Sequence, residues 1–334
     1  MTHPRTSHVG SFPLDYAKDL VERILVELHE IGLSVPPYPQ MRSFIDIYLE
    51  PLAKRGVLEK RGDFYFARPE SLLEAEPVAE PIPEAEDTVS IVRRRGLSFD
   101  ELRGPVTGVF TLASRVYLEH NIEAGLRATA LARRDLVEEF FVPYVHRYLE
   151  YLSKLGYRVL FIDEPILGVI VGRRRILFGY TEDFIHEVLR SVFRGISAPM
   201  RGIHVCGRIS ARLFDILSRS EVLDVLNFEF FDTPENLGVV DPKALEENKK
   251  VLAPGIASAK KPRVESLDEV VTVLRKVYDK ANGLIDLVSA DCGFGGLKGV
   301  VEPGEALRIS IGKLRRVVEA VAMLSGGDEA GPLS

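Results

Sequence analysis

The sequence predicts an α/β fold of the (β/α)8 TIM-barrel type, in which eight parallel strands alternate with helices. Short β-rich runs that end near glycine, proline or an acid recur at residues 7–12, 32–38, 104–111, 158–165, 201–207, 224–230, 251–258 and 284–293. Helical periodicity fills several of the intervals between them, and this alternation is typical of a barrel. An open doubly wound sheet is the alternative, but no glycine-rich fingerprint follows the first run.

The helical stretches carry their own start and stop signals. In residues 14–32, Leu20, Ile24 and Leu28 recur every four residues, and Gly32 stands where a helix C-cap belongs. Ser266 and Glu269 have the spacing of a capping box, which predicts the start of a helix. Further helices are predicted within residues 181–195, 210–220, 266–283 and 304–324.

Residues 56–98 interrupt the alternation. Residues 56–69 predict a hairpin with its turn near residues 61–63, and residues 74–87 are acidic and rich in proline. We expect the second stretch to be an extended excursion, because it is too polar and too broken for a core helix. The sequence thus predicts one barrel domain over residues 1–325, with this insertion inside it, and a flexible tail over residues 326–334.

Composition and charge exclude several classes of protein. The 43 basic and 49 acidic residues give a net charge of −6, which argues against nucleic-acid binding. No apolar run approaches the roughly 18 residues of a membrane span, and residues 1–16 lack the apolar core of a signal peptide. We therefore expect a cytoplasmic protein. One Gln, five Asn and no Trp beside abundant charged residues are typical of thermophile proteins.

Potential metal ligands stand at the ends of the predicted strands, which converge on one mouth of a barrel. Cys206 and Cys292 are the only cysteines, and His204 lies two residues before Cys206, so both point to the same side of their strand. Glu229 and Cys292 could complete a set of thiolates, imidazole and carboxylate that suits Zn²⁺. The alternative is a buried thiol, a core histidine and a surface acid without a common role.

Two adjacent acids, Asp163 and Glu164, end the fourth run before Pro165. Neighbouring strand residues face opposite ways, so at most one of the two looks into the mouth. A carboxylate there could hold a substrate ammonium group. The alternative is a salt bridge with an arginine.

Together these motifs resemble the C-terminal catalytic barrel of cobalamin-independent methionine synthase. The matching segments are "VGSFP" at 9–13, "IDEP" at 162–165, "HVC" at 204–206, "NFEF" at 227–230 and "DCG" at 291–293. Their order and spacing together are specific, although each motif alone is weak. The resemblance covers nearly the whole chain except residues 40–98.

The resemblance implies a zinc-dependent methyltransferase that converts L-homocysteine to L-methionine. It implies that the amino group of homocysteine meets Asp163, while its carboxylate meets Ser11 and the backbone around Val9. It also implies that zinc is bound by four ligands, namely His204, Cys206, Glu229 and Cys292. Zinc coordination would deprotonate the substrate thiol, which is a poor nucleophile while neutral.

The sequence departs from the family in ways that bear on the methyl donor. The N-terminal barrel of the full-length enzyme has no counterpart, as in the short form seen in archaea. The folate-stacking tryptophan is missing, as is the acid that follows the "DEP" motif, and the position of the proton-donor histidine holds Lys260. We therefore expect a methyl-pterin other than polyglutamyl methyl-folate, or a methyl-corrinoid, free or bound to a protein.

Two other functions remain open at this point. A uroporphyrinogen decarboxylase-like barrel would need an arginine-rich cleft near its N-terminus, where residues 1–11 offer only Arg5. A non-catalytic partner of a separately encoded N-terminal-like barrel protein is the third possibility. The intact ligand set argues against a loss of catalysis.

Overall fold

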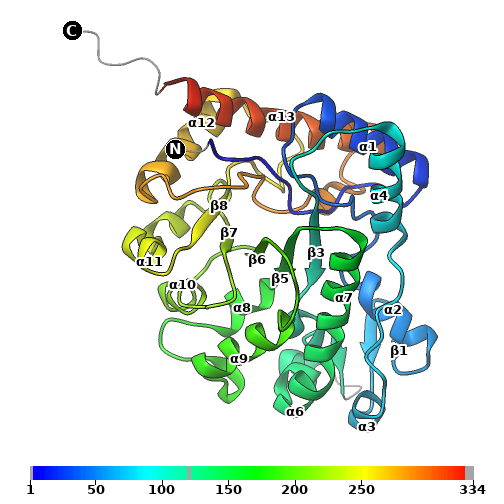
Figure 1. Cartoon of the computed structure of the whole chain (residues 1–334). Coiled ribbons are helices and arrows are strands. Elements are labelled where there is room, and N and C mark those ends of the chain that lie inside the picture. The colour runs from blue at the N-terminus through cyan, green and yellow to red at the C-terminus, as the bar shows by residue number, and fades with distance from the viewer. Residues whose placement is uncertain (1–2, 119–121, 328–334) are drawn as a thin grey trace.

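The computed structural model describes residues 3–118 and 122–327. Its main sheet contains five parallel strands (Figure 1), in the order β3 (Arg103–Thr107), β5 (Val159–Asp163), β6 (Met200–Val205), β7 (Val225–Glu229) and β8 (Val251–Gly255). All five coincide with runs predicted from the sequence. Their register aligns Asp163 of β5 with His204 of β6.

The other three predicted runs join this sheet through isolated parallel bridges. The first run pairs with the second through Ser7–Val35, and the residue just before it pairs with the last run through Thr6–Val288. The second run pairs with β3 through Pro37–Arg103, and the last run pairs with β8 through Gly255–Ser289. Proline lacks a backbone N–H, so Pro36, Pro37 and Pro39 limit pairing in the second run. The eight runs form a ring, and the predicted (β/α)8 fold is confirmed.

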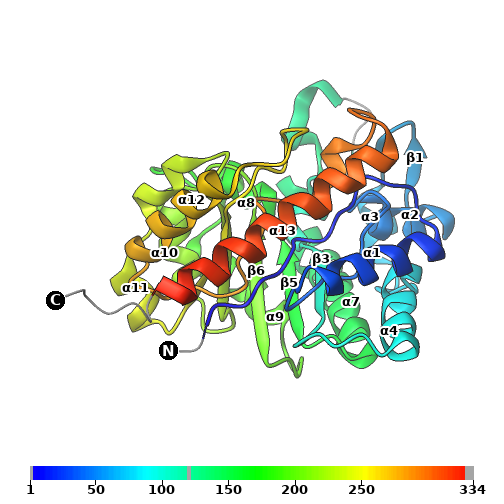
Figure 2. The ribbon, with the colours of Figure 1, turned by 90° about the horizontal axis from the view of Figure 1, so that it is seen from above.

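Helices surround the strands (Figure 1 and Figure 2). The longer ones are α1 (Lys18–Glu30), α2 (Asp46–Lys54), α4 (Pro83–Arg95), α7 (Val142–Leu155), α9 (Glu182–Val192), α10 (Ala211–Ser218), α12 (Leu267–Lys280) and α13 (Pro303–Gly327). The shorter ones are α3 (Pro69–Leu73), α5 (Val109–Ala113), α6 (Arg134–Leu136), α8 (Pro165–Ile170) and α11 (Pro242–Glu247). Short 3-10 helices lie at Ile122–Ala128, Ala130–Ala132, Leu177–Gly179, Pro234–Val239 and Phe294–Leu297. A short π-helix lies at Val137–Phe141.

The predicted helix signals hold where the structure describes them. The Ser266 hydroxyl accepts a hydrogen bond from the Glu269 N–H, and the Glu269 carboxylate accepts one from the Ser266 N–H, so the capping box begins α12. Gly32, just after α1, has a φ of +79°, which glycine adopts readily. Helix α13 continues to Gly327, and residues 328–334 of the predicted tail lie outside the described residues.

The hairpin predicted in the insertion is present. Strand β1 (Glu59–Arg61) pairs antiparallel with β2 (Phe64–Phe66), and Gly62 in the turn has a φ of +57°. Strand β2 also pairs in parallel with β4 (Val116–Tyr117), so the hairpin becomes part of a separate three-stranded sheet.

The extended excursion predicted over residues 74–87 is partly wrong, because α4 begins at Pro83. Proline is tolerated in the first turn of a helix, where its missing N–H has no intrahelical partner. Acids in the first turn and three arginines in the last turn complement the helix dipole. The polar side chain of Glu84 is fully buried because Arg42 pairs with it at 2.6 and 2.7 Å.

Apolar side chains fill the barrel interior around one aromatic ring. This inner cluster consists of Val35, Val159, Phe161, Val225, Ala253 and Leu287. Gly202 makes room for the Phe161 ring, because a Cβ atom there would lie 2.3 Å from it. A larger core packs between the strands and the helices. Among the described residues, no helix combines the length and apolar character that crossing a membrane requires.

Candidate metal centre and active site

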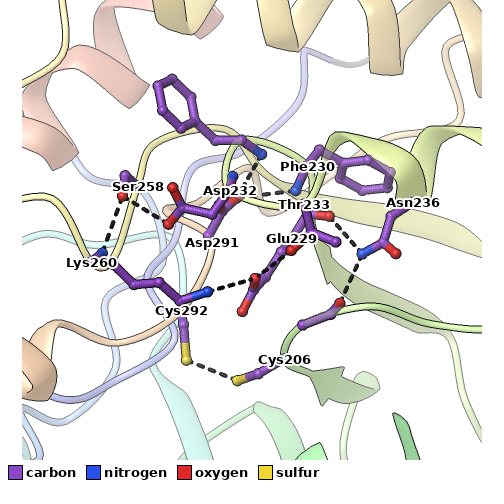
Figure 3. Close-up of polar contacts among 12 residues, drawn as sticks. Cys206, Glu229, Phe230, Asp232, Thr233, Asn236, Ser258, Lys260, Asp291 and Cys292 are labelled. Carbon is purple, nitrogen blue, oxygen red and sulfur yellow. Dashed lines mark hydrogen bonds and ion pairs between the residues drawn. The ribbon is translucent and has the colours of Figure 1, made fainter.

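Three potential metal ligands meet at the carboxyl-terminal mouth of the barrel. Figure 3 shows two of them, Cys206 and Cys292, with their sulfur atoms facing each other. His204 belongs to β6, Cys206 follows that strand directly, and Cys292 follows the last run of the ring. The His204 Nε2 atom lies 2.9 Å from the Cys206 Sγ atom, which lies 2.9 Å from the Cys292 Sγ atom. One ligand atom from each residue falls within 4.8 Å of the others.

This group of side chains fits a zinc ion. Two thiols and an imidazole are donors that Zn²⁺ accepts. The hydrogen bond between the cysteines raises the pKa of Cys206 and lowers that of Cys292, so Cys292 becomes a thiolate first. The buried Nδ1 atom of His204 has no hydrogen-bond partner among the described residues, so the two ring nitrogens of this histidine have different surroundings.

Glu229, the fourth predicted ligand, lies beside this group and not within it. It is the last residue of β7 and is 2% exposed. Its Oε2 atom accepts a hydrogen bond from the Thr233 hydroxyl at 3.0 Å and lies 3.7 Å from the Lys260 Nζ atom (Figure 3). The structure therefore brings three predicted ligands together and places Glu229 in the wall of the same cavity.

Asp291, a buried aspartate outside the predicted set of site residues, ties these loops together. One oxygen of Asp291 accepts hydrogen bonds from the N–H groups of Phe230 and Phe231 at 3.0 Å, and the other accepts one from Asp232. Burial raises the pKa of Asp291 to about 8. Because Asp291 precedes Cys292, these bonds fix the cysteine loop against the turn that follows Glu229 (Figure 3).

A cavity of about 780 Å³ opens above the cysteines. Its polar wall includes Ser11, Gln40, Glu229 and Lys260, and its apolar wall includes Phe12, Met41, Phe44, Pro165 and Val169. Such a volume lies within the range of small-molecule and cofactor sites and exceeds the needs of one small amino acid. Gln40 is 2% exposed, and no motif in the sequence marks it.

The residues predicted to bind the amino acid occupy different positions around this cavity. Ser11 lines it, and its hydroxyl accepts a hydrogen bond from the Gly295 N–H at 3.0 Å. Val9 is buried and Asp163 is 6% exposed, and neither lines the cavity wall. The Asp163 Oδ1 atom has no hydrogen-bond partner among the described residues, and burial raises the pKa of this carboxyl to about 6.

Glu164 has a structural position instead. Its carboxylate accepts hydrogen bonds from the Phe110 N–H, the Thr111 N–H and the Thr111 hydroxyl at 2.7–2.9 Å. These bonds hold the first turn of α5. Gly108 allows the close approach, since a Cβ atom there would lie 2.2 Å from the Glu164 carboxyl carbon. Neither Glu164 nor Asp163 forms an ion pair among the described residues, so no arginine bridge is present there.

A buried cation lies in the barrel interior below the metal ligands. The guanidinium carbon of Arg103 lies 3.8 Å from the centre of the Phe161 ring, and its Nη2 atom lies 3.3 Å from the Asn227 Oδ1 atom. Its Nε and Nη1 atoms have no partner among the described residues, and burial lowers its pKa to about 10. No motif in the sequence marks this residue, which begins the short strand β3.

Comparison with known proteins agrees with the motif resemblance. The family described as "Cobalamin-independent synthase, Catalytic domain" matches residues 122–310. A 5-methyltetrahydropteroyltriglutamate–homocysteine methyltransferase of Lactococcus lactis is 24% identical over 231 residues, which are 67% of this chain and 27% of that protein. The chain thus spans about a quarter of the length of this curated relative. The family match favours the synthase resemblance over the decarboxylase-like alternative.

Two solved structures share the fold over almost their whole length. A B12-independent methionine synthase from Shewanella in complex with selenomethionine has a TM-score of 0.70 at 15% identity, covering 99% of this chain and 100% of its own. A methyltransferase from Methanosarcina mazei has a TM-score of 0.68 at 13% identity, covering 97% and 95%. At these identities the likeness establishes the shared barrel architecture.

Proposed function

The chain belongs to the cobalamin-independent synthase family, and on this premise we propose that it transfers a methyl group to the thiol of L-homocysteine to give L-methionine. The observation that carries the proposal is the meeting of His204, Cys206 and Cys292 under a cavity large enough for an amino acid and a second substrate. A zinc ion at this position would keep the substrate thiol deprotonated at neutral pH.

The protein would hold that ion through His204, Cys206, Cys292 and Glu229. The first three already converge, and Glu229 would exchange its hydrogen bond to Thr233 for the metal. Asp291 would preserve the spacing between Glu229 and Cys292, because its carboxylate joins the loops that follow them. Anionic ligands would keep the substrate sulfur electron-rich.

The amino acid would be bound by Asp163, Ser11 and the backbone around Val9. Asp163 offers an unpaired, buried carboxylate oxygen to the ammonium group, and Ser11 offers a hydroxyl at the cavity wall to the carboxylate. The sulfur electron pair would form the new bond to the methyl carbon. The bond between the methyl group and its carrier would break, with the electron pair staying on the carrier.

Lys260 would act as a positive charge and not as a proton donor. Partial burial opposes its ionisation, but the charges of Glu229 and Asp232 outweigh this and raise its pKa. It therefore stays an ammonium near neutral pH. Its side chain is 67% exposed, so it can turn between Glu229 and an anionic part of the second substrate.

We propose that the second substrate is a methyl-pterin other than polyglutamyl methyl-folate, or a methyl-corrinoid. The chain has no tryptophan to stack on a folate, and the apolar wall of the cavity is formed by Met41, Phe44 and Val169. A protein that carries the donor, or a separately encoded N-terminal-like barrel, would supply contacts that this chain lacks.

Metal analysis of the purified protein tests the centre. We expect about one zinc per chain in the wild type and little in Cys206→Ser or Cys292→Ser, because each substitution removes a thiolate ligand. Lys276→Ala, which changes an exposed residue of α12, is the matched control. Equal zinc in Cys292→Ser and in the control would refute the proposed centre.

A donor screen tests the reaction. Zinc-loaded protein would be incubated with homocysteine and, in turn, methylcobalamin, methyl-tetrahydrofolate or methyl-tetrahydromethanopterin, and methionine would be measured. We expect methionine from a corrinoid or from the pterin without a polyglutamate chain. Failure with every free donor, in protein that holds zinc, would contradict the use of a free donor and require a protein-bound one.

A further inference from the structure

A second cavity lies at the same mouth of the barrel, between the loops that follow β5, β6 and β7. Its volume is about 480 Å³. Arg173 and Arg208 line it together with Glu235, with Ser210, which caps the N-terminus of α10, and with Ala211, the first residue of that helix. None of these residues belongs to the metal centre or to the predicted amino-acid site.

We call this second cavity the rim cavity, and we call the cavity of about 780 Å³ above the cysteines the active cavity. Only the backbone of one short helix lies between the two. Gly168 lines the rim cavity and Val169 lines the active cavity, and both belong to α8. A Cβ atom on Gly168 would lie 3.3 Å from the Arg208 carbonyl oxygen and 3.6 Å from that of Cys206. Helix α8 therefore packs directly on the turn that carries both Cys206 and Arg208.

The arginines of the rim cavity have no counter-charge bound to them. Arg173 and Arg208 are exposed, and among the described residues neither forms an ion pair or a side-chain hydrogen bond. By contrast, Arg212 of α10 and Arg219 just after that helix both pair with Glu182. Two unpaired guanidinium groups beside one cavity, in a protein with a net charge of −6, form a local positive site.

The chemistry of this wall suits a small oxyanion. A guanidinium group matches the geometry of a phosphate or carboxylate with two parallel N–H donors. The Ser210 hydroxyl already accepts a hydrogen bond from the Leu213 N–H at 3.1 Å, so the N-terminus of α10 is partly capped. The N–H of Ala211, which lines the cavity, has no intrahelical partner and adds one donor at the same wall. Glu235 leaves the wall with one net positive charge from these three side chains, which favours a single anionic group over a polyanionic chain.

We propose that the rim cavity binds the phosphate or carboxylate group of the methyl donor while its methyl-bearing part occupies the active cavity. This inference rests on the proposed methyl transfer. The Cα atoms of Arg208 and Cys206 are at most about 7 Å apart, because only Gly207 lies between them in the chain. Methylcobalamin and methyl-tetrahydromethanopterin each carry a phosphate group remote from the methyl group, so either donor could span the two cavities.

Kinetics with matched donors test the inference. In the Arg173→Gln/Arg208→Gln double variant, we expect the KM for methylcobalamin to rise about tenfold or more, since charge-assisted hydrogen bonds are lost. The KM for homocysteine, the zinc content and the use of methylcobinamide, which lacks the nucleotide phosphate, should not change. A matching rise with methyl-tetrahydromethanopterin would identify a pterin phosphate as the bound group. Arg190→Gln, on α9, is the control for loss of an exposed arginine.

Direct binding separates this inference from the proposed function. Inorganic phosphate, titrated by calorimetry into zinc-loaded protein, should bind the wild type and Arg190→Gln but not the double variant, and Glu235→Gln should bind it more tightly. Phosphate binding without methyl transfer would support the anion site and count against the proposed reaction alone. Equal phosphate binding in the double variant and the control, or none in the wild type, would overturn the anion site.

Discussion

Two fully buried cations, one in the outer helices and one in the barrel interior, differ in the groups that surround their charges. Lys313 of α13 lies 2.7 and 2.8 Å from the two carboxylate oxygens of Glu265, and both side chains are fully buried. Arg103 lies against the Phe161 ring and Asn227, with no carboxylate within ion-pair distance among the described residues. One cation has a local partner, whereas the other does not.

The difference indicates what each cation does. Burial lowers the pKa of Lys313, and Glu265 opposes this, so the pair fastens α13 to the segment that precedes α12. Burial also lowers the pKa of Arg103, but the charges that oppose this are those of Asp163 and Cys292. The unpaired cation thus lies where the proposed thiolates and substrate-binding carboxylate would concentrate negative charge.

The largest effect should come from breaking the local pair. Lys313→Met leaves Glu265 buried without a partner, so the free energy of unfolding should fall by about 3–5 kcal/mol. Urea denaturation would measure it. The double variant Lys313→Met/Glu265→Leu should recover most of the loss, because two apolar groups then replace the pair. If the double variant is no more stable than the single one, an unpaired Glu265 is not the cause of the stability loss in Lys313→Met.

A smaller loss should follow from disturbing the aromatic support of Arg103. Gly202→Ala places a Cβ atom 2.3 Å from the Phe161 ring, and such overpacking costs about 1–3 kcal/mol. Thermal and urea unfolding would measure the loss. Gly238→Ala, where a Cβ atom would meet nothing within 4 Å, is the matched control. Equal stability of the two variants would show that the barrel interior around Phe161 accommodates the added methyl group without losing stability.

Replacing Arg103, the unpaired cation, should increase the stability of the protein, whereas the two changes above decrease it. Arg103→Met removes a buried charge without orphaning a bonded carboxylate, so the metal-free protein should gain about 1 kcal/mol. The affinity for zinc should also fall, because the positive charge of Arg103 favours the thiolate form of Cys292, and chelator competition would measure the fall. If Arg103→Met is destabilised and its zinc affinity is unchanged, Arg103 supports the fold, as Lys313 does, and not the metal site.

The smallest effect should be a pH dependence assigned to Arg103. Its pKa is about 10 in the folded protein, which is well below the ordinary value of an arginine, so above pH 10 the unfolded chain binds more protons. Stability should therefore rise with pH relative to Arg103→Met, by less than about 1 kcal/mol at pH 10.5. Parallel urea titrations of the two proteins from pH 8 to 10.5 would show it, and parallel curves would contradict it.

The barrel was predictable because its strands are apolar runs that end in recognisable polar residues. The same pattern located His204, Cys206 and Cys292, since period-two alternation and strand ends depend on local sequence. The extent of the barrel domain, the role of Glu229 as a ligand, the cytoplasmic location and the thermophilic source stay predictions.

What escaped prediction depends on contacts between distant parts of the chain. The helix that begins at Pro83 looked too acidic for the core, because its burial depends on Arg42, which lies about 40 residues earlier. Asp291 binds backbone N–H groups of residues 230–232, and no spacing rule signals such a contact. Arg103 became a buried cation only through the ring and amide that surround it.

The ion pair between Arg42 and Glu84 also limits how freely this protein can be re-engineered. Arg42 lines the active cavity, while Glu84 lies in α4, within the insertion. Trimming residues 56–98 would remove Glu84 and leave Arg42 without its partner and free to move within the cavity that it lines. A replacement segment taken from another barrel would need to deliver a buried carboxylate to the same point, so the insertion is not an exchangeable module.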